Sequence, residues 1–169
     1  NIEQRYLDGE LSWEEDGETI ETTFFNKGNV QHRAYTYFKA LAEKETDNAK
    51  KEVYNNIANL HYERFIDWYL ETTGFTKSAA GYSYEINNIG APVLNETEVA
   101  AARTIRTNKI DNLLSDINHE EYSEENYDII TSMVNDAKGE LMDATTIYEM
   151  DKIVSDLTTE ISKIEKIGE

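Results

Sequence analysis

The sequence predicts a mainly α-helical protein, in which an N-terminal helical unit with a small β-hairpin precedes an antiparallel three-helix bundle. Proline occurs once and glycine eight times in 169 residues, so few residues interrupt helices. Apolar side chains recur three and four residues apart through most of the chain, which is the period of one helix face. Between residues 11 and 25 the period changes to two around an Asp-Gly pair, which is typical of a hairpin.

The β-hairpin is predicted over Leu11–Phe25, with a two-residue turn at Asp16-Gly17. This turn sets the register of the two strands and places their apolar side chains on one face. Because a lone hairpin is marginal in water, we expect that face to cover a helix. The cross-strand pairs that follow from the register are Glu15 with Glu18, Trp13 with Ile20, and Leu11 with Thr22.

Two antiparallel helices are expected after the hairpin. Lys27-Gly28 is expected to end the hairpin, and Asn29 to cap a helix from Val30 to Lys44. The next helix, from Lys51 to Thr72, has an apolar arc so wide that we expect neighbours on more than one side. Two adjacent stripes form this arc: Val53, Ile57, Leu60 and Arg64, and beside them Tyr54, His61, Phe65 and Trp68.

A short strand or extended loop is predicted around Tyr82–Asn87, where large and polar side chains alternate. It could join the hairpin as a third strand. Gly90-Ala91-Pro92 is typical of a boundary. The predicted domains are therefore residues 1–93 and residues 95–169.

Three helices of roughly twenty residues are predicted in the second domain, and short turns between them favour an antiparallel bundle. Each begins at a residue whose side chain can cap a helix, and two of these residues are followed by a glutamate that completes a capping box. The predicted N-caps are Asn95, Ser123 and Thr146, with Glu98 and Glu149 completing the two boxes.

Two segments of this domain resemble the FIVAR module, a three-helix unit of many secreted Gram-positive surface proteins and glycan-active enzymes. Tyr122–Tyr127 resembles the start of that family's second helix. The resemblance covers residues 97–167, and it implies an extracellular spacer or binding module rather than a catalyst. The link into the family's third helix is similar to Ala137, Leu141, Asp143-Ala144-Thr145, Glu149, Val154 and Leu157.

Composition excludes several classes of function. The net charge is −18, from 34 acidic and 16 basic residues, which opposes binding to nucleic acid. The chain has no cysteine, which excludes disulfides and thiolate metal sites. No apolar run is long enough for a membrane span. The first residue is Asn1, so we expect a processed or excised piece of an extracellular or surface protein of bacteria.

Residues with catalytic or metal-binding chemistry are sparse, so we expect no enzymatic activity, no cofactor and no metal site. Three histidines occur, none in a zinc or di-iron pattern. Asp116 and His119 are three residues apart, but two ligands do not make a site. Glu63 and Asp67, one helical turn apart, form the single acid pair worth considering for glycosidase chemistry.

A basic strip is predicted on one flank of the third helix. Arg103, Arg106 and Lys109 lie along it. The strip could bind an acidic partner, or it could form a surface lattice of ion pairs with Glu98 and Asp111.

Aromatic side chains are the candidate ligand-binding residues. Eleven tyrosines in 169 residues is a high count, and tyrosine and tryptophan are enriched where proteins bind one another. The leading hypothesis is binding to a host or cell-surface protein such as an immunoglobulin. The alternatives are a glycan-binding or spacer module, and a core in which the rings are buried. The candidate binding residues are Tyr62, Trp68, Tyr69, Tyr82 and Tyr84.

Overall fold

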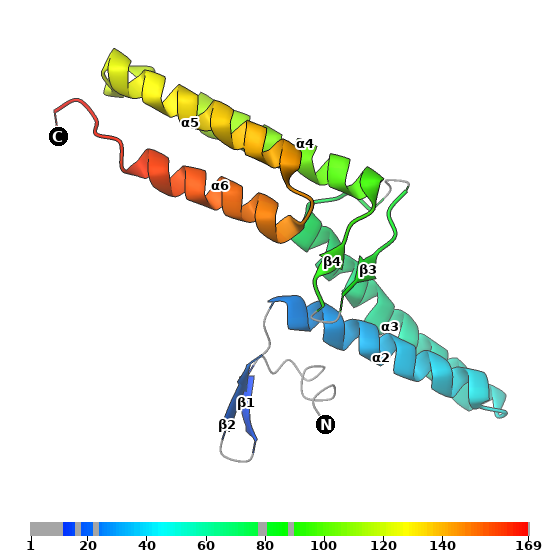
Figure 1. The fold of residues 1–169 in the computed structure, drawn as a ribbon. Coiled ribbons are helices and arrows are strands. Elements are labelled where there is room, and N and C mark those ends of the chain that lie inside the picture. The colour runs from blue at the N-terminus through cyan, green and yellow to red at the C-terminus, as the bar shows by residue number, and fades with distance from the viewer. Residues whose placement is uncertain (1–11, 16–17, 22–23, 78–80, 88–89, 169) are drawn as a thin grey trace. The chain divides into compact units, whose positions relative to one another are not determined.

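The protein is mainly helical with small antiparallel pairs of strands, as the sequence predicts (Figure 1). It divides into two compact units. The first contains residues 1–72 and 84–93, and the second contains residues 73–83 and 94–169. The computed structural model describes residues 12–15, 18–21, 24–77, 81–87 and 90–168.

The predicted N-terminal hairpin is present. Its strands are β1, Ser12–Glu15, and β2, Glu18–Glu21. They pair antiparallel with Trp13 opposite Ile20 and Glu15 opposite Glu18, which confirms the register that the Asp-Gly turn dictates. The turn itself and the predicted pair of Leu11 with Thr22 lie outside the described residues.

The first long helix, α2, covers Phe24–Lys44 and begins earlier than the sequence predicts. Lys27-Gly28 therefore does not end the hairpin, and Asn29 lies inside the helix instead of capping it. Gly28 serves a packing role: a Cβ atom built on it would lie 2.4 Å from Cζ3 of Trp68. Glycine here allows the two helices of the unit to approach closely, because any side chain would occupy the space of the indole ring.

The central helix, α3, covers Asn48–Thr73 and ends where the sequence predicts. Gly74 follows with φ of +86°, the left-handed conformation that suits glycine after a helix. Ring contacts pair later residues of α2 with earlier residues of α3, which shows that the two helices run antiparallel. These contacts are His32 with Phe65, Tyr35 with Tyr62, and Phe38 with Tyr54.

Only one of the two apolar stripes on α3 is buried. His61, Phe65 and Trp68 are at most 6% exposed. On the adjacent stripe, Val53 and Leu60 are 54% and 47% exposed. The late part of α3 does have neighbours on more than one side, because Tyr69 is 0% exposed and its ring meets Tyr84 at 5.2 Å, whereas the stripe of Val53 and Leu60 stays exposed.

A second hairpin belongs to the same unit. Its strands are β3, Glu85–Ile86, and β4, Pro92–Val93, and they pair with each other antiparallel. The prediction of a third strand on the first hairpin is wrong, since β3 and β4 form a separate two-stranded sheet. Gly90 helps to turn the chain, since its N–H donates to the Asn87 carbonyl at 3.0 Å, and the division between the two units follows after Val93.

The second unit contains the predicted three-helix bundle. Its helices are α4, Glu96–Ser115, α5, Glu124–Asp143, and α6, Ile147–Ser162, with a short 3-10 helix, η1, at His119–Glu121. α6 runs antiparallel to α5. The side chain of Asn126, near the start of α5, donates to the carbonyl of Glu165, just after the end of α6, at 3.1 Å. The described helices contain no segment both long and apolar enough to cross a membrane.

The predicted N-caps of the bundle are confirmed. Asn95 and Glu98 form a reciprocal capping box, and Ser123 accepts a hydrogen bond from the N–H of Asn126 at 3.1 Å. Thr146 accepts from the N–H of Glu149 at 3.1 Å. The capping box at Thr146 is incomplete, because the Glu149 carboxylate accepts from the N–H of Thr145 and not from that of Thr146.

Arg106 is buried in the bundle, so the predicted basic strip does not exist as a surface feature. The Arg106 side chain is 2% exposed; its Nε donates to Asp151 Oδ1 at 3.0 Å and its Nη1 donates to the Thr73 carbonyl. Arg103 donates to the carbonyl of Ala144. The predicted lattice partners do not form it either: Asp111 pairs with Lys138, and Glu98 accepts from Ser83 and Asn95.

Candidate protein-binding surface

The aromatic residues expected to bind a ligand do not form one surface. Trp68 and Tyr69 are 6% and 0% exposed, and their rings lie in the core of the first unit with Phe65. Tyr62 is 40% exposed and its ring contacts Tyr35 at a centroid distance of 4.8 Å. Of the three, Tyr62 alone presents a face to solvent.

Tyr82 and Tyr84 are half-buried and belong to different units. The ring of Tyr84 meets Tyr69 edge-on at 5.2 Å in the first unit. In the second unit, the ring of Tyr82 stacks on Phe75 at 4.3 Å. Both rings already have aromatic neighbours. Trp68, a candidate residue for glycan binding, is buried.

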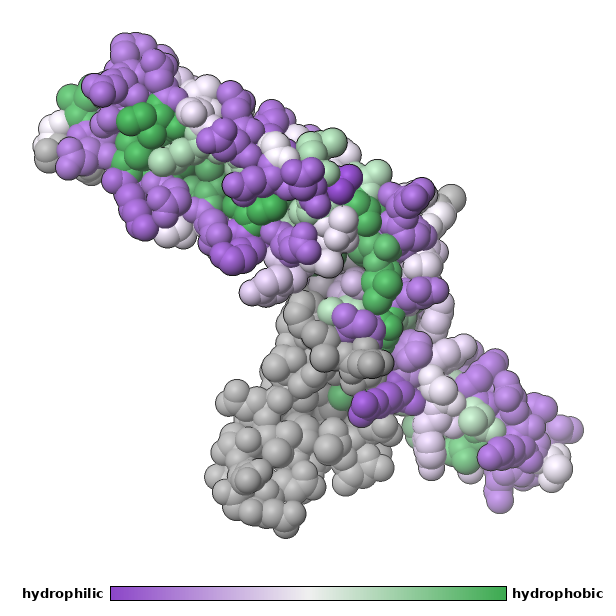
Figure 2. All heavy atoms as spheres, in the orientation of Figure 1, coloured by the Kyte–Doolittle hydropathy of each residue, from purple (hydrophilic) through white to green (hydrophobic). Residues whose placement is uncertain are grey.

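A different group of large side chains is exposed on the α2–α3 pair. Tyr37 on α2 is 55% exposed, and its exposed fraction is similar to those of Val53 (54%) and Leu60 (47%) on α3. Exposed aromatic and aliphatic side chains gathered on one face are characteristic of interaction sites. Figure 2 shows hydrophobic surface among hydrophilic atoms at the end of this pair, where α2 gives way to α3.

The exposed residues lie on the same flank of the helix pair. Tyr35 and Tyr62 meet on one flank. Tyr37 follows Tyr35 by two residues, and Leu60 precedes Tyr62 by two, so each is rotated by about 200° around its helix. Tyr37 and Leu60 therefore both emerge on the flank opposite the Tyr35–Tyr62 contact. We call this flank the Tyr37–Leu60 face.

Val53 extends this face, because it is seven residues from Leu60 and shares its helical stripe. Exposed cations border the apolar residues at helical spacing. Arg33 and Lys44 lie four residues before and seven after Tyr37, and Arg64 lies four residues after Leu60. Exposed Glu63 and Asp67 lie three and seven residues after Leu60, so the face combines apolar contact area with charges of both signs.

Charge is distributed unevenly along the chain. Residues 24–93 contain 8 acidic and 8 basic residues and are neutral overall. Residues 94–169 contain 18 acidic and 7 basic residues, a net charge of −11. The Tyr37–Leu60 face thus lies on a segment without net charge, between residues 1–23, which carry −7, and residues 94–169.

A buried polar pair lies beneath the aromatic layer. The side chain of His61 is 1% exposed, and its Nδ1 lies 2.8 Å from Gln31 Oε1. Because that oxygen can only accept, Nδ1 carries the proton, and Nε2 is buried with no hydrogen-bond partner among the described residues. Burial lowers the pKa of His61 below its usual value of 6.5, and the charge of Arg64 lowers it further.

The other chemical candidates lie apart from any catalytic arrangement. Glu63 and Asp67 are both exposed on α3. His119 stacks on Tyr127 at 3.7 Å and lies 3.2 Å from a carboxylate oxygen of Glu124, so it does not pair with Asp116. Within the described part of the chain, no group of three or more histidine, aspartate or glutamate side chains could hold a metal ion.

No protein-family model, curated protein or solved structure matches this chain. The site is therefore defined by the residues themselves. Sequence analysis found Val53 and Leu60 as an apolar stripe but expected it to be covered, and it did not single out Tyr37. The spacing of residues along α3 shows that two stripes exist, whereas the choice of the buried one depends on where α2 lies.

Proposed function

We propose that this chain is a non-enzymatic, extracellular protein-binding module of a bacterial secreted or surface protein. Its binding surface is the Tyr37–Leu60 face. The observation that carries the proposal is the exposure of Tyr37, Val53 and Leu60, each 47% or more, on a segment without net charge. Tyrosine is among the residue types that supply most of the binding energy at protein interfaces, and the two aliphatic side chains add apolar contact area to the same face.

The second unit supports the extracellular part of the proposal. The proposal draws on the resemblance of its sequence to the FIVAR module, whose members serve as spacers and binding modules outside the cell. The chain has no cysteine, which suits a Gram-positive surface protein. In this proposal the first unit makes the contact with the partner. This step is an analogy at the level of fold.

The proposal favours binding over catalysis because of the position of the acid pair. Glu63 and Asp67 are exposed on the outer side of α3. Glycosidase chemistry needs two carboxyl groups that flank a bound sugar and differ in pKa, which requires a pocket that gives them different environments. An exposed pair on one helix does not provide this environment.

The partner class is a host or cell-surface protein, with immunoglobulin as the first candidate to test. Immobilised protein is incubated with serum, and bound proteins are identified by mass spectrometry. Affinity for purified immunoglobulin is then measured by surface plasmon resonance. Capture of no serum protein by the wild-type chain would count against the proposal.

Two double variants of equal chemistry assign the surface. Tyr37→Ser with Leu60→Ser removes an aromatic and an aliphatic anchor from the proposed face and weakens binding by about tenfold or more. Tyr148→Ser with Met142→Ser removes a similar pair, 68% and 63% exposed, from the bundle and leaves binding unchanged. Equal losses in the two variants would show that the contact is not on the Tyr37–Leu60 face.

A further inference from the structure

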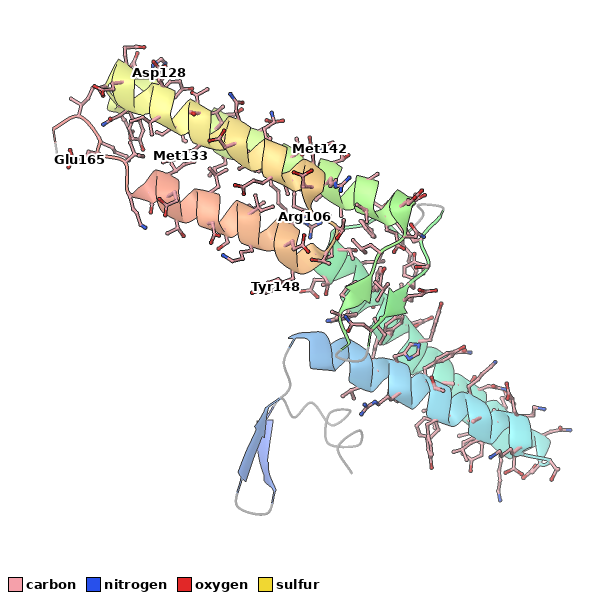
Figure 3. All side chains as sticks on the ribbon, in the orientation of Figure 1. Arg106, Asp128, Met133, Met142, Tyr148 and Glu165 are labelled. Carbon is pink, nitrogen blue, oxygen red and sulfur yellow. The ribbon has the colours of Figure 1, made fainter. Side chains whose placement is uncertain are left out.

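A shallow groove runs between α5 and α6 on the outer side of the bundle. Its volume is about 190 Å³. Figure 2 shows hydrophobic surface along this side of the bundle, bordered by hydrophilic atoms, and Figure 3 shows Met133 between the two helices. The floor is apolar and the edges are acidic. The lining residues are Met133, Ala137, Ile153 and Leu157, with Asp136, Glu140, Asp156 and Glu160.

The two sides of the groove carry the same sequence pattern. Residues 133–140 read MVNDAKGE and residues 153–160 read IVSDLTTE. In both segments the first and fifth residues are apolar and the fourth and eighth are acidic. This spacing places all four residues on one helix face. Because α5 and α6 run antiparallel, the two segments are related by an approximate two-fold axis through the groove. An apolar channel with acids along both edges follows from this repetition.

The two acidic edges differ in how well they are neutralised. On α6, Asp156 pairs with Lys152 at 2.7 Å, and Glu160 pairs with Lys163 at 3.1 Å. On α5, Asp136 and Glu140 have no ion-pair partner among the described residues. The α5 edge therefore keeps two uncompensated negative charges beside apolar surface.

The apolar surface continues beyond the groove along α5. Ile129 precedes Met133 by four residues, shares its helix face and is 40% exposed. From Ile129 to Glu140 the stripe extends for about 16 Å, or three helical turns. A long, straight, shallow channel of this kind fits the apolar face of an elongated partner better than it fits a compact small molecule.

We propose that the α5–α6 groove is a docking site for a basic amphipathic helix of a partner protein. The helix would place apolar side chains, spaced three and four residues apart, against Met133 and Leu157, completing a four-helix arrangement. Its lysine or arginine side chains would lie along the α5 edge, beside Asp136 and Glu140. The groove is formed by α5 and α6, so it shares no residue with the Tyr37–Leu60 face.

The probe for this proposal is a fluorescein-labelled peptide of leucine and lysine, about 14 residues or four helical turns long, with its leucines on one helix face. A second peptide has the same composition in an order that spreads leucine around the helix. Binding to the full chain is measured by fluorescence anisotropy at an ionic strength of about 150 mM, where long-range attraction is screened. The amphipathic peptide is expected to bind, and the reordered peptide to bind at least about tenfold more weakly.

Charge-neutralising variants locate the contact. Asp136→Asn with Glu140→Gln weakens binding of the amphipathic peptide by about tenfold. Asp156→Asn with Glu160→Gln removes the same formal charge and has a smaller effect, because those carboxylates already hold lysines. Asp116→Asn with Asp128→Asn removes two exposed acids outside the groove and leaves affinity within about twofold. Circular dichroism verifies that each variant keeps its helices.

Three results would overturn the proposal. The first is no binding of the amphipathic peptide. The second is equal binding of both peptides, which would indicate general attraction to an acidic protein. The third is a loss in the Asp116/Asp128 variant as large as in the Asp136/Glu140 variant. Chemical-shift changes confined to residues 129–140 and 153–160 would support it.

Discussion

At the scale of single residues, buried polar groups mark the points where tertiary contacts override local preference. His61 lies in an aromatic layer, stacked on Phe38 at 5.9 Å, with one nitrogen bonded to Gln31 and the other unsatisfied. Arg106 is satisfied by Asp151 and the carbonyl of Thr73. A buried charge or polar atom lowers the stability of the folded state unless it is paired. Arg106 is paired and one nitrogen of His61 is not, so the two residues affect stability in opposite directions. Arg106 holds residues of the bundle together, whereas His61 makes stability depend on pH.

Lowering the pH is expected to destabilise the first unit through His61. Its pKa is lower in the folded state than the unfolded value of 6.5, so the unfolded chain binds more protons as pH falls. The stabilisation is complete above pH 6.5 and is lost progressively as pH decreases from 6.5 through the folded pKa. Urea unfolding at several pH values between about 7.5 and 5.5 measures this slope, in a range where carboxylates stay ionised.

The His61→Gln variant is the control for this prediction. Glutamine can still donate to Gln31, but it does not titrate. The fall in unfolding free energy between pH 7.5 and 5.5 is therefore smaller in the variant than in the wild type. An identical slope in both proteins would assign the pH dependence to other groups.

At the scale of elements, local sequence determines where helices begin, whereas the packing of side chains between helices determines their contacts. The caps at Asn95, Ser123 and Thr146 form because short side chains accept from backbone N–H groups within three residues. α2 differs, because Gly28 lies within the helix and against the indole ring of Trp68. The same residue type thus ends one helix at Gly74 and permits close packing of another at Gly28.

Two glycine-to-alanine substitutions in helices should have opposite effects. Gly28→Ala places a Cβ 2.4 Å from the Trp68 ring, and such overpacking costs about 1–3 kcal/mol, more than the gain of about 1 kcal/mol in helix propensity. Gly139→Ala in α5 meets no atom within 4 Å and should stabilise by about 0.5–1 kcal/mol. Urea denaturation followed by circular dichroism measures both. A stabilised Gly28→Ala variant would contradict the close helix approach.

At the scale of the whole molecule, the charge of −18 acts against compactness. Repulsion among like charges destabilises the folded state, and it arises from residues 1–23, which carry −7, and residues 94–169, which carry −11. The neutral segment of residues 24–93 lacks this penalty. The proposed Tyr37–Leu60 face lies on this neutral segment.

Raising NaCl from low ionic strength to about 0.5 M should raise Tm at pH 7 by a few degrees. The reason is that salt screens repulsion between exposed acids, and each kcal/mol corresponds to about 2–4 °C in a chain of this size. Thermal melts at pH 4.5, near the isoelectric point, provide the comparison. There the net charge is close to zero, so the increase should be much smaller. Equal increases at both pH values would indicate that screening is not the cause.

Much of the local structure follows from the sequence by itself. The Asp-Gly turn fixes the pairing of Trp13 with Ile20, because a two-residue turn allows one register. Capping side chains define the starts of the bundle helices, and apolar spacing predicts their core positions. These features depend on interactions between residues close in the chain, whose geometry the backbone already restricts.

Only the tertiary structure decides which of several equivalent faces is buried. The spacing of α3 offers two apolar stripes, and the position of α2 buries His61 and Phe65 while leaving Val53 and Leu60 exposed. Arg106 has the sequence signature of a surface residue, yet an acceptor from residue 73 makes its burial favourable. Exposure is a property of the assembled helices, because it depends on what lies opposite each side chain and not on the order of residues within one helix.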